Sequence, residues 1–193
     1  MSNDDRARWD RRYVLGHGAD APSGFLTEVF QSESSRLPAG RALDIATGKG
    51  SNALFLAERG FDVDAIDISS VALEEARLRA EQKGLSVSWQ QADLERIELP
   101  VARYDLVLNL KYLQRSLIPQ LKAALKLGGH VIFETYLIDQ KEAGHPKNPA
   151  YLLAHNELLE NFRDFRVLRY REGKFCEGSE ASFRAGIFAQ RVS

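Results

Sequence analysis

One stretch of ten residues limits the folds open to this chain more than any other. It runs from Arg41 to Gly50 and reads RALDIATGKG. Leu43 and Ile45 are typical of the end of a short buried strand, two glycines follow at once, and residues 51–59 are typical of a helix. A strand, a glycine loop and a helix form the first unit of a nucleotide-binding α/β fold, because glycine lets the backbone turn tightly and approach a ligand.

The next apolar segment, residues 61–66, predicts a second strand that ends at Asp67. A carboxylate at this position can accept hydrogen bonds from both hydroxyls of a ribose. Asp67 can instead cap the helix that is expected to begin near Ser69. Both interpretations place the carboxylate at the carboxyl end of a strand.

Two classes of cofactor compete for this unit. Gly48, Gly50 and Ala53 fit the G-x-G-x-x-A pattern of dinucleotide sites, and Asp67 lies near the spacing expected there. Asp44 argues against this interpretation, because a pyrophosphate binds a helix N-terminus with no anion beside it. S-adenosylmethionine has no phosphate and carries an ammonium and a sulfonium. An acid at the strand end is compatible with these positive charges.

The stretch resembles the first motif of the class I S-adenosylmethionine-dependent methyltransferases, D/E-x-G-x-G-x-G, with Ala46 in place of the first glycine. The resemblance covers residues 42–136. It implies a doubly wound, Rossmann-like α/β fold: a mostly parallel seven-stranded sheet with helices on both faces and an antiparallel last strand. The alternation of strands and helices at short spacing also favours a parallel sheet.

We expect a single methyltransferase domain over residues 1–193, with an N-terminal helical cap or lid (1–40) and a Rossmann-like core (41–193). Further strands are expected at 87–89, 104–110 and 130–135, with a helix from Ser116 to the Gly128-Gly129 pair. Residues 150–162 are expected to be mostly helical. Residues 165–170 and 183–190 are expected to form two antiparallel strands joined by a polar connection, 172–182.

The resemblance assigns cofactor-binding roles to groups at four successive strand ends, where ligands bind in open α/β sheets. Asp93 would bond the adenine amino group, although it can instead cap a turn before Glu95. Asn109 and Leu110 would lie under the methionine moiety. The expected cofactor-binding residues are Asp44, Ala46, Gly48, Gly50, Asp67, Ile68, Asp93, Leu94, Asn109 and Leu110.

A narrower resemblance lies outside the core. Trp9-Asp10-x-x-Tyr13 with Pro22 and Phe25, together with the segments 109–115 and 146–149, is similar to small methyltransferases of the tellurite-resistance and thiopurine type. It implies a small, soft or thiol-like acceptor. We expect residues 9–25 to fold over the cofactor as a lid, with Tyr13 directed toward the transferring methyl as a candidate catalytic residue. The alternative is that both aromatic residues only anchor a helix to the core.

Methyl transfer needs no protein nucleophile, because the donor is itself reactive. The candidate bases, should the acceptor have to lose a proton, are Tyr13, His17, Glu134, Tyr136 and His145. Lys111 and Arg115 are candidates to face an anionic substrate. Two other functions stay open: an NAD(P)-dependent oxidoreductase, and a non-catalytic S-adenosylmethionine-binding protein.

Composition and charge limit the classes of partner that this chain is expected to bind. The chain has 193 residues with a formal net charge of −1, so no overall basic field attracts nucleic acid. No apolar run approaches the length of a membrane span, and the charged N-terminus has no signal-peptide core. The four histidines and one cysteine lack metal-ligand spacing, so we expect no metal. The expectation is a cytoplasmic monomer or homodimer acting on a small-molecule acceptor.

Overall fold

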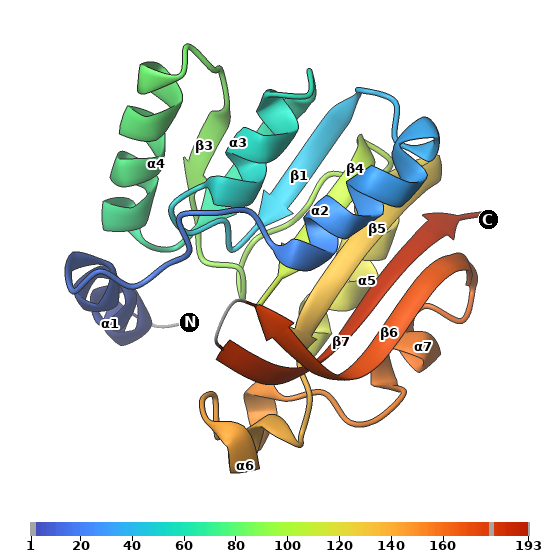
Figure 1. Ribbon diagram of the computed structural model, residues 1–193. Coiled ribbons are helices and arrows are strands. Elements are labelled where there is room, and N and C mark those ends of the chain that lie inside the picture. Colours follow the sequence, from blue (N-terminus) through green and yellow to red (C-terminus); the bar gives the residue numbers. More distant parts are fainter. Residues whose placement is uncertain (1–2, 178–179, 193) are drawn as a thin grey trace.

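The computed structural model describes residues 3–177 and 180–192 (Figure 1). Within them the strands form one seven-stranded sheet with the order β3-β2-β1-β4-β5-β7-β6. The first five strands run parallel, and β7 is antiparallel to both of its neighbours. The predicted sheet and its antiparallel last strand are therefore confirmed. The strands are β1 (Arg41–Ile45), β2 (Asp62–Asp67), β3 (Ser88–Gln91), β4 (Tyr104–Leu110), β5 (Leu125–Tyr136), β6 (Phe165–Glu177) and β7 (Glu180–Arg191).

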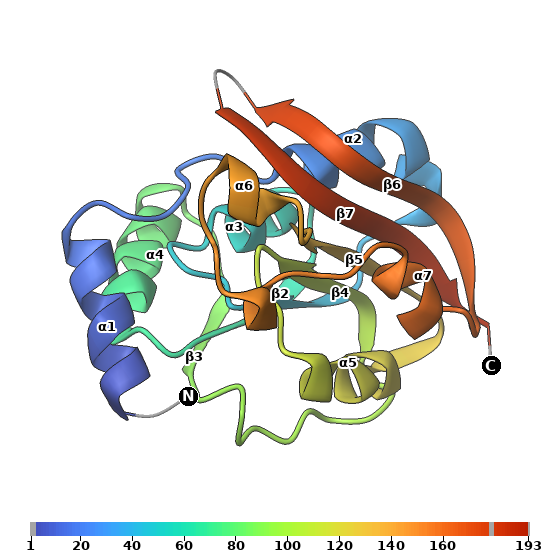
Figure 2. The ribbon, with the colours of Figure 1, turned by 90° about the horizontal axis from the view of Figure 1, so that it is seen from below.

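Helices cover both faces of the sheet, which buries its central strands on two sides (Figures 1 and 2). One face packs against α2 and α3 through Phe25, Leu26 and Leu56, and the other against α5 and α7 through Leu121 and Leu158. No described helix is long and apolar enough to cross a membrane. The helices are α1 (Asn3–Val14), α2 (Gly24–Glu33), α3 (Ser51–Ala57), α4 (Ser70–Gln82), α5 (Ile118–Ala124), α6 (Gln140–Ala143) and α7 (Glu157–Asn161).

The register of the parallel strands places the loops that follow them at one edge of the sheet. Ile45 at the end of β1 pairs with Ile66 of β2 and with Asn109 of β4. Helix α1 lies beside α4 and outside the sheet (Figures 1 and 2). Asp10 of α1 fastens it there, because its Oδ1 accepts a 2.6 Å hydrogen bond from the hydroxyl of Ser69. The N-terminal segment is thereby held at the edge where β1 and β2 end.

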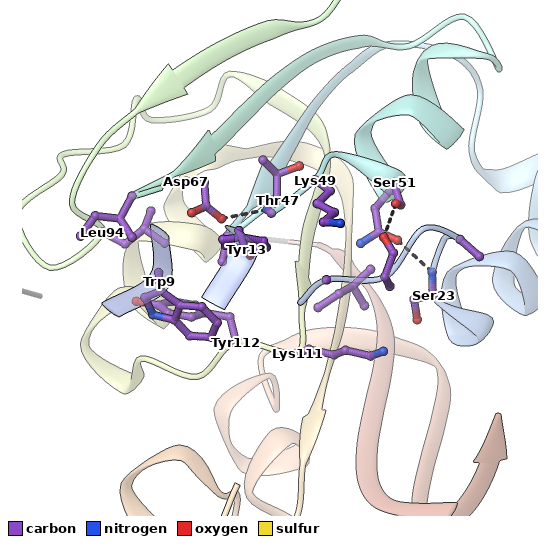
Figure 3. Close-up of a pocket in the computed structure, with 18 residues that line it drawn as sticks. Trp9, Tyr13, Ser23, Thr47, Lys49, Ser51, Asp67, Leu94, Lys111 and Tyr112 are labelled. Carbon is purple, nitrogen blue, oxygen red and sulfur yellow. Dashed lines mark hydrogen bonds between the residues drawn. The ribbon is translucent and has the colours of Figure 1, made fainter. Parts of the chain in front are cut away.

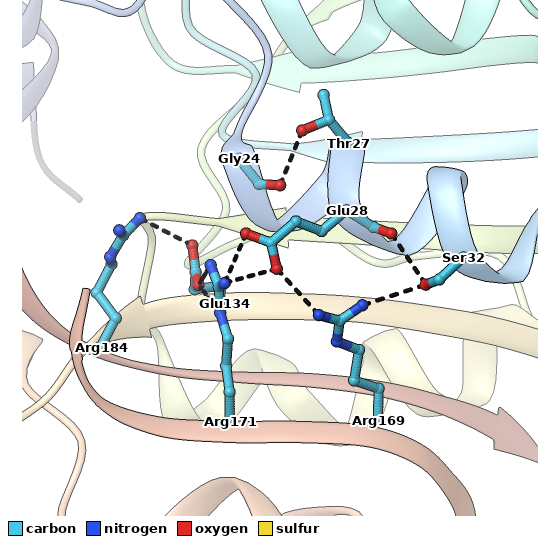
Figure 4. A network of polar contacts seen from close by, with 8 residues as sticks. All are labelled: Gly24, Thr27, Glu28, Ser32, Glu134, Arg169, Arg171 and Arg184. Atoms are coloured by element: carbon cyan, nitrogen blue, oxygen red, sulfur yellow. Dashed lines mark hydrogen bonds and ion pairs between the residues drawn. The ribbon is translucent and has the colours of Figure 1, made fainter. Parts of the chain in front are cut away.

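A chain of ion pairs ties α2 to the last strands (Figure 4). Glu134 of β5 is fully buried, and its carboxylate lies 2.6 Å from Arg171 of β6 and 3.1 Å from Arg184 of β7. Arg171 and Arg169 also bond Glu28 of α2, at 2.9 and 3.1 Å. These contacts fix the position of α2 relative to the carboxyl end of β5.

The C-terminal third differs from the prediction. Residues 150–162 contain a 3-10 turn at Pro149–Tyr151 and the five residues of α7, rather than one long helix. The expected polar connection, 172–182, instead lies largely in strands, since β6 and β7 pair up to Glu177 and Glu180. The two strands of this extension are held together by backbone hydrogen bonds. Their side chains therefore do not have to alternate between apolar and polar residues. β5 likewise begins at Leu125, before the glycine pair.

Candidate active site

A cavity of about 200 Å³ lies at the carboxyl ends of β1, β2 and β4, between the sheet edge and the N-terminal segment (Figure 3). Its walls come from four parts of the chain: residues 9–23, the loop after β1 with the start of α3, the ends of β2 and β4 with the residues that follow them, and Leu94 after β3. The lining residues are Trp9, Tyr13, Gly18, Ala19, Ala21, Ser23, Ala46, Thr47, Gly48, Lys49, Ser51, Asn52, Asp67, Ile68, Leu94, Leu110, Lys111 and Tyr112.

The loop after β1 has left-handed backbone at Ala46, Gly48 and Gly50, with φ of 53°, 55° and 75°. A Cβ on Gly48 would lie 2.7 Å from the hydroxyl oxygen of Tyr13, so glycine is what lets α1 approach the loop. A Cβ on Gly50 would lie 2.6 Å from the Trp89 ring, so this glycine serves packing and does not line the cavity. Ala46 holds its left-handed conformation at a cost of about 1 kcal/mol.

Asp67 lines the cavity at the end of β2 and is 5% exposed. Its Oδ2 accepts from the backbone N–H of Gly48 at 2.8 Å, and its Oδ1 from that of Ser69 at 2.9 Å. Burial raises the pKa of Asp67, and these two hydrogen bonds oppose the rise. Each oxygen keeps a lone pair for a ligand hydroxyl. Ser69, rather than Asp67, provides the side-chain cap of α4 by accepting from the N–H of Ala72.

Asp44 lies beneath the same loop and is 1% exposed. Its Oδ2 accepts a 2.5 Å hydrogen bond from the hydroxyl of Thr47, whereas its Oδ1 is buried without a well-formed hydrogen bond. Burial raises the pKa of Asp44 to about 7, while Thr47 and the N–H of Ala53 favour the ionised form and Asp67 opposes it. Among the described residues, no lysine or arginine forms an ion pair with Asp44 or Asp67. Two buried acids without a cationic partner suit a cationic ligand.

Aromatic residues form the wall opposite the loop. The rings of Trp9 and Tyr13 lie 6.0 Å apart on α1, and Tyr112 reaches the cavity from the turn after β4. Burial, followed by the charge of Asp67, raises the pKa of Tyr13 far above its ordinary value. The Tyr13 hydroxyl therefore stays protonated at neutral pH and is a hydrogen-bond donor rather than a base.

Hydrogen bonds hold the segment that follows α1 against the start of α3. The hydroxyl of Ser51 donates to the carbonyl of Ala19 at 2.6 Å, and the N–H of Ser23 donates to Oδ1 of Asn52 at 2.9 Å. Arg79 of α4 donates to the carbonyls of Asp20 and Lys49 at 2.8 and 3.0 Å. Residues 18–23 thus form a fixed strap along one side of the cavity.

Most of the expected site residues meet at this cavity. Those that line it are Tyr13, Ala46, Gly48, Asp67, Ile68, Leu94 and Leu110. Asp44 lies directly below the loop, and Gly50 faces Trp89. Asp93 bonds the N–H of Glu95 at 2.9 Å, as its turn-capping alternative predicted, and Asn109 donates to the carbonyl of Tyr112 at 2.7 Å. Neither lines the cavity, so their cofactor-binding roles stay predictions.

The other candidate bases and Arg115 lie outside the cavity lining. Tyr13 is the one candidate base that lines the cavity within the described part of the chain. Glu134 is fully buried outside the cavity lining, where its carboxylate pairs with Arg171 and Arg184. Arg115 bonds Glu157 at 2.6 Å and the carbonyls of Ala150 and Leu152, so it fastens the C-terminal region instead of facing a substrate. No group of three or more His, Cys, Asp or Glu residues in the described ranges is placed to hold a metal ion.

Thr47, Lys49 and Asn52 line the cavity but were not predicted as site residues, and Ser23 was predicted only as part of the lid segment, residues 9–25. Thr47 and Lys49 flank Gly48 inside the loop motif, and this position was the available signal. Ser23 and Asn52 are 29 positions apart, and the hydrogen bond that brings them together depends on the tertiary fold. No local sequence pattern predicts such a pair.

Comparison with known proteins identifies the family. A methyltransferase domain model matches residues 42–129. The ubiquinone biosynthesis O-methyltransferase of Azotobacter vinelandii is 34% identical over 171 residues, which are 80% of this chain and 69% of that protein. That of Alkalilimnicola ehrlichii is 36% identical over 101 residues, 49% of this chain and 41% of the relative. The chain thus spans less than half the length of the first curated relatives it matches.

The structure is similar to TehB from Haemophilus influenzae, with a TM-score of 0.76 and 21% identity, over 95% of this chain and 67% of that one. This likeness shows the fold and agrees with the expected resemblance to tellurite-resistance-type proteins. The glycine loop, the acids at the ends of β1 and β2, the strand order and the relative from Azotobacter vinelandii all agree. The chain belongs to the class I S-adenosylmethionine-dependent methyltransferases.

Proposed function

We propose that this protein transfers a methyl group from S-adenosylmethionine to a small-molecule acceptor in the cavity at the ends of β1, β2 and β4. The observation that carries the proposal is the pair of buried acids, Asp44 and Asp67, on either side of the glycine loop. An anionic pyrophosphate beside them would be repelled, whereas a ligand with an ammonium and a sulfonium is attracted. Asp67 would accept from the ribose hydroxyls, and Asp44 would favour the ammonium end.

The cofactor supplies an activated methyl group on sulfonium, and the protein supplies alignment and a dry site. The strap and the aromatic wall of Trp9, Tyr13 and Tyr112 would exclude water from the reacting atoms. Tyr13, protonated and placed over Gly48, would orient the acceptor by donating a hydrogen bond. Helix α1 would act as a lid, with Gly16, between α1 and the fixed strap, giving it freedom to open.

A small acceptor is supported by the cavity volume of about 200 Å³ and by the relatives, whose names place them in ubiquinone biosynthesis as O-methyltransferases. We keep the finer expectations as predictions: a soft or thiol-like acceptor atom, a cytoplasmic location and a monomeric or homodimeric state. Ile68 and Leu94, which line the cavity, would contact the adenine ring.

The test is a transfer assay with methyl-labelled S-adenosylmethionine and a panel of small thiols, phenols and amines. The expected result is label on one acceptor class with one S-adenosylhomocysteine formed per methyl transferred. Asp67→Asn should reduce transfer at limiting cofactor, and the matched control Asp62→Asn, at the exposed start of β2, should not. Cofactor binding with no transfer to any panel member would contradict the enzymatic role and favour a non-catalytic binding protein.

A further inference from the structure

Ser23 stands immediately before α2, where a serine usually accepts a hydrogen bond from a backbone N–H of the first helical turn. Here the side chain makes no such bond. Ser23 is 8% exposed, its hydroxyl is buried with no hydrogen-bond partner, and it lines the cavity. An unpaired buried hydroxyl lowers the stability of the folded protein, so a hydroxyl left in this state at a cavity wall suggests a ligand that pairs with it.

The end of α2 that meets Ser23 favours a negative ligand. The helix has ten residues and no acidic side chain in its first turn. Its first N–H groups point out of the helix end, and the helix dipole places partial positive charge there. Asn52 adds to this polarity, because its Oδ1 already accepts from the Ser23 N–H and its amide nitrogen remains a donor at the same wall. The ion pairs from Glu28 to the last strands hold α2 in place (Figure 4).

Lys111 brings a full positive charge to the same cavity. It follows the end of β4 in a left-handed conformation, φ 60°, and its backbone N–H donates to the Glu134 carbonyl at 2.7 Å. Figure 3 shows its side chain running along the cavity away from Trp9 and Tyr112 and toward the side that holds Ser23. Lys49 also lines the cavity, and its ammonium lies 3.1 Å from the carboxylate of Glu75.

We propose that Ser23, Asn52 and Lys111 form a subsite that binds the carboxylate of a ligand at this end of the cavity. The inference rests on the proposed function, since it divides the cavity into a cation-favouring part, at Asp44 and Asp67, and an anion-favouring part, at the start of α2. Two ligands can supply the carboxylate: the methionine moiety of the cofactor, or an acidic acceptor bound beside it.

The variants are Ser23→Ala and Lys111→Met, with Ser32→Ala near the other end of α2 and Lys126→Met, which pairs with Asp105, as matched controls. Removal of an unpaired hydroxyl leaves no partner unsatisfied, so Ser23→Ala should not lower the melting temperature of the ligand-free protein. Loss of ligand binding in this variant would then report on the subsite rather than on folding.

The first arm compares binding of S-adenosylmethionine with its decarboxylated form, which keeps the ammonium and sulfonium. If the subsite holds the cofactor carboxylate, the wild type binds the intact cofactor about tenfold or more tightly, and both variants reduce this ratio. The second arm titrates the S-adenosylhomocysteine complex with acetate or acetamide at constant ionic strength and follows the Asn52 side-chain amide by NMR. If the subsite holds an acceptor carboxylate, acetate alone shifts this signal saturably, and both variants abolish the shift.

Either positive arm supports the subsite and names the source of the carboxylate. The proposal is overturned if both variants leave the cofactor ratio unchanged and acetate has no more effect than acetamide. It is also overturned if the control variants produce the same losses. A protein that binds S-adenosylhomocysteine normally but fails both arms refutes the subsite alone, whereas a protein that binds neither cofactor form refutes the proposed function as well.

Discussion

Replacement of Asp44 by asparagine is expected to stabilise the ligand-free protein at alkaline pH while weakening its binding of S-adenosylmethionine. Burial raises the pKa of Asp44 from 3.8 to about 7. A rise of about three pH units corresponds to a stability change of roughly 4 kcal/mol. Between the two pKa values the folded protein binds more protons than the unfolded chain, so this contribution to stability is present at low pH and is lost as pH rises through about 7.

Urea unfolding at pH 5 and pH 8 measures this effect. Because asparagine carries no charge, the unfolding free energy of Asp44→Asn relative to the wild type should rise between pH 5 and pH 8 by roughly 2.6 kcal/mol, since about two of the three pH units of the shift fall in this interval. Calorimetry at pH 8 should show weaker cofactor binding, by about 1.5–3 kcal/mol, if Asp44 favours the ammonium. Asp62→Asn, at an exposed acid of the same sheet, should show neither effect.

Equal differences between Asp44→Asn and the wild type at both pH values would refute the assignment of a raised pKa to Asp44. A pH-dependent stability difference with unchanged cofactor affinity would support the raised pKa of the buried Asp44 but would show that Asp44 does not contribute to cofactor binding.

Two further predictions concern single residues. Tyr13→Phe keeps the ring that packs over Gly48 and removes the hydroxyl, so turnover should fall by ~100-fold or more with cofactor affinity unchanged; unaltered turnover would leave Tyr13 with a packing role only. Glu134→Gln removes the charge that both Arg171 and Arg184 contact in the interior, so urea unfolding should show a loss of about 3–5 kcal/mol, and a loss below about 1 kcal/mol would contradict the buried pairing.

The first half of the core could be predicted from the sequence because its signals are local. Buried strands, the glycine loop and the acid after β2 follow one another within 30 residues, and each has its own pattern. The mostly parallel sheet with its antiparallel last strand and the place of Asp67 at the cavity followed from that one unit and from the family resemblance.

Features set by tertiary contacts could not be predicted in this way. The long pairing of β6 with β7 is carried by backbone hydrogen bonds and leaves little trace in a polar sequence. Asp93 and Asn109 have the residue types expected of ligands, but each is engaged by backbone groups of its own turn. Ser23 and Asn52 become neighbours only when α2 packs beside α3, so the anion-favouring end of the cavity is visible only in the structure.

The most direct test of the central claim is calorimetric titration of the purified protein with S-adenosylhomocysteine and, separately, with NADH. The account predicts one S-adenosylhomocysteine per chain with a micromolar dissociation constant, about 8 kcal/mol of binding free energy, and no measurable heat from NADH. Asp67→Asn should weaken the S-adenosylhomocysteine binding at least about tenfold, because each lost charge-assisted hydrogen bond to a ribose hydroxyl weakens the complex. Tight binding of NADH with none of S-adenosylhomocysteine would contradict the account.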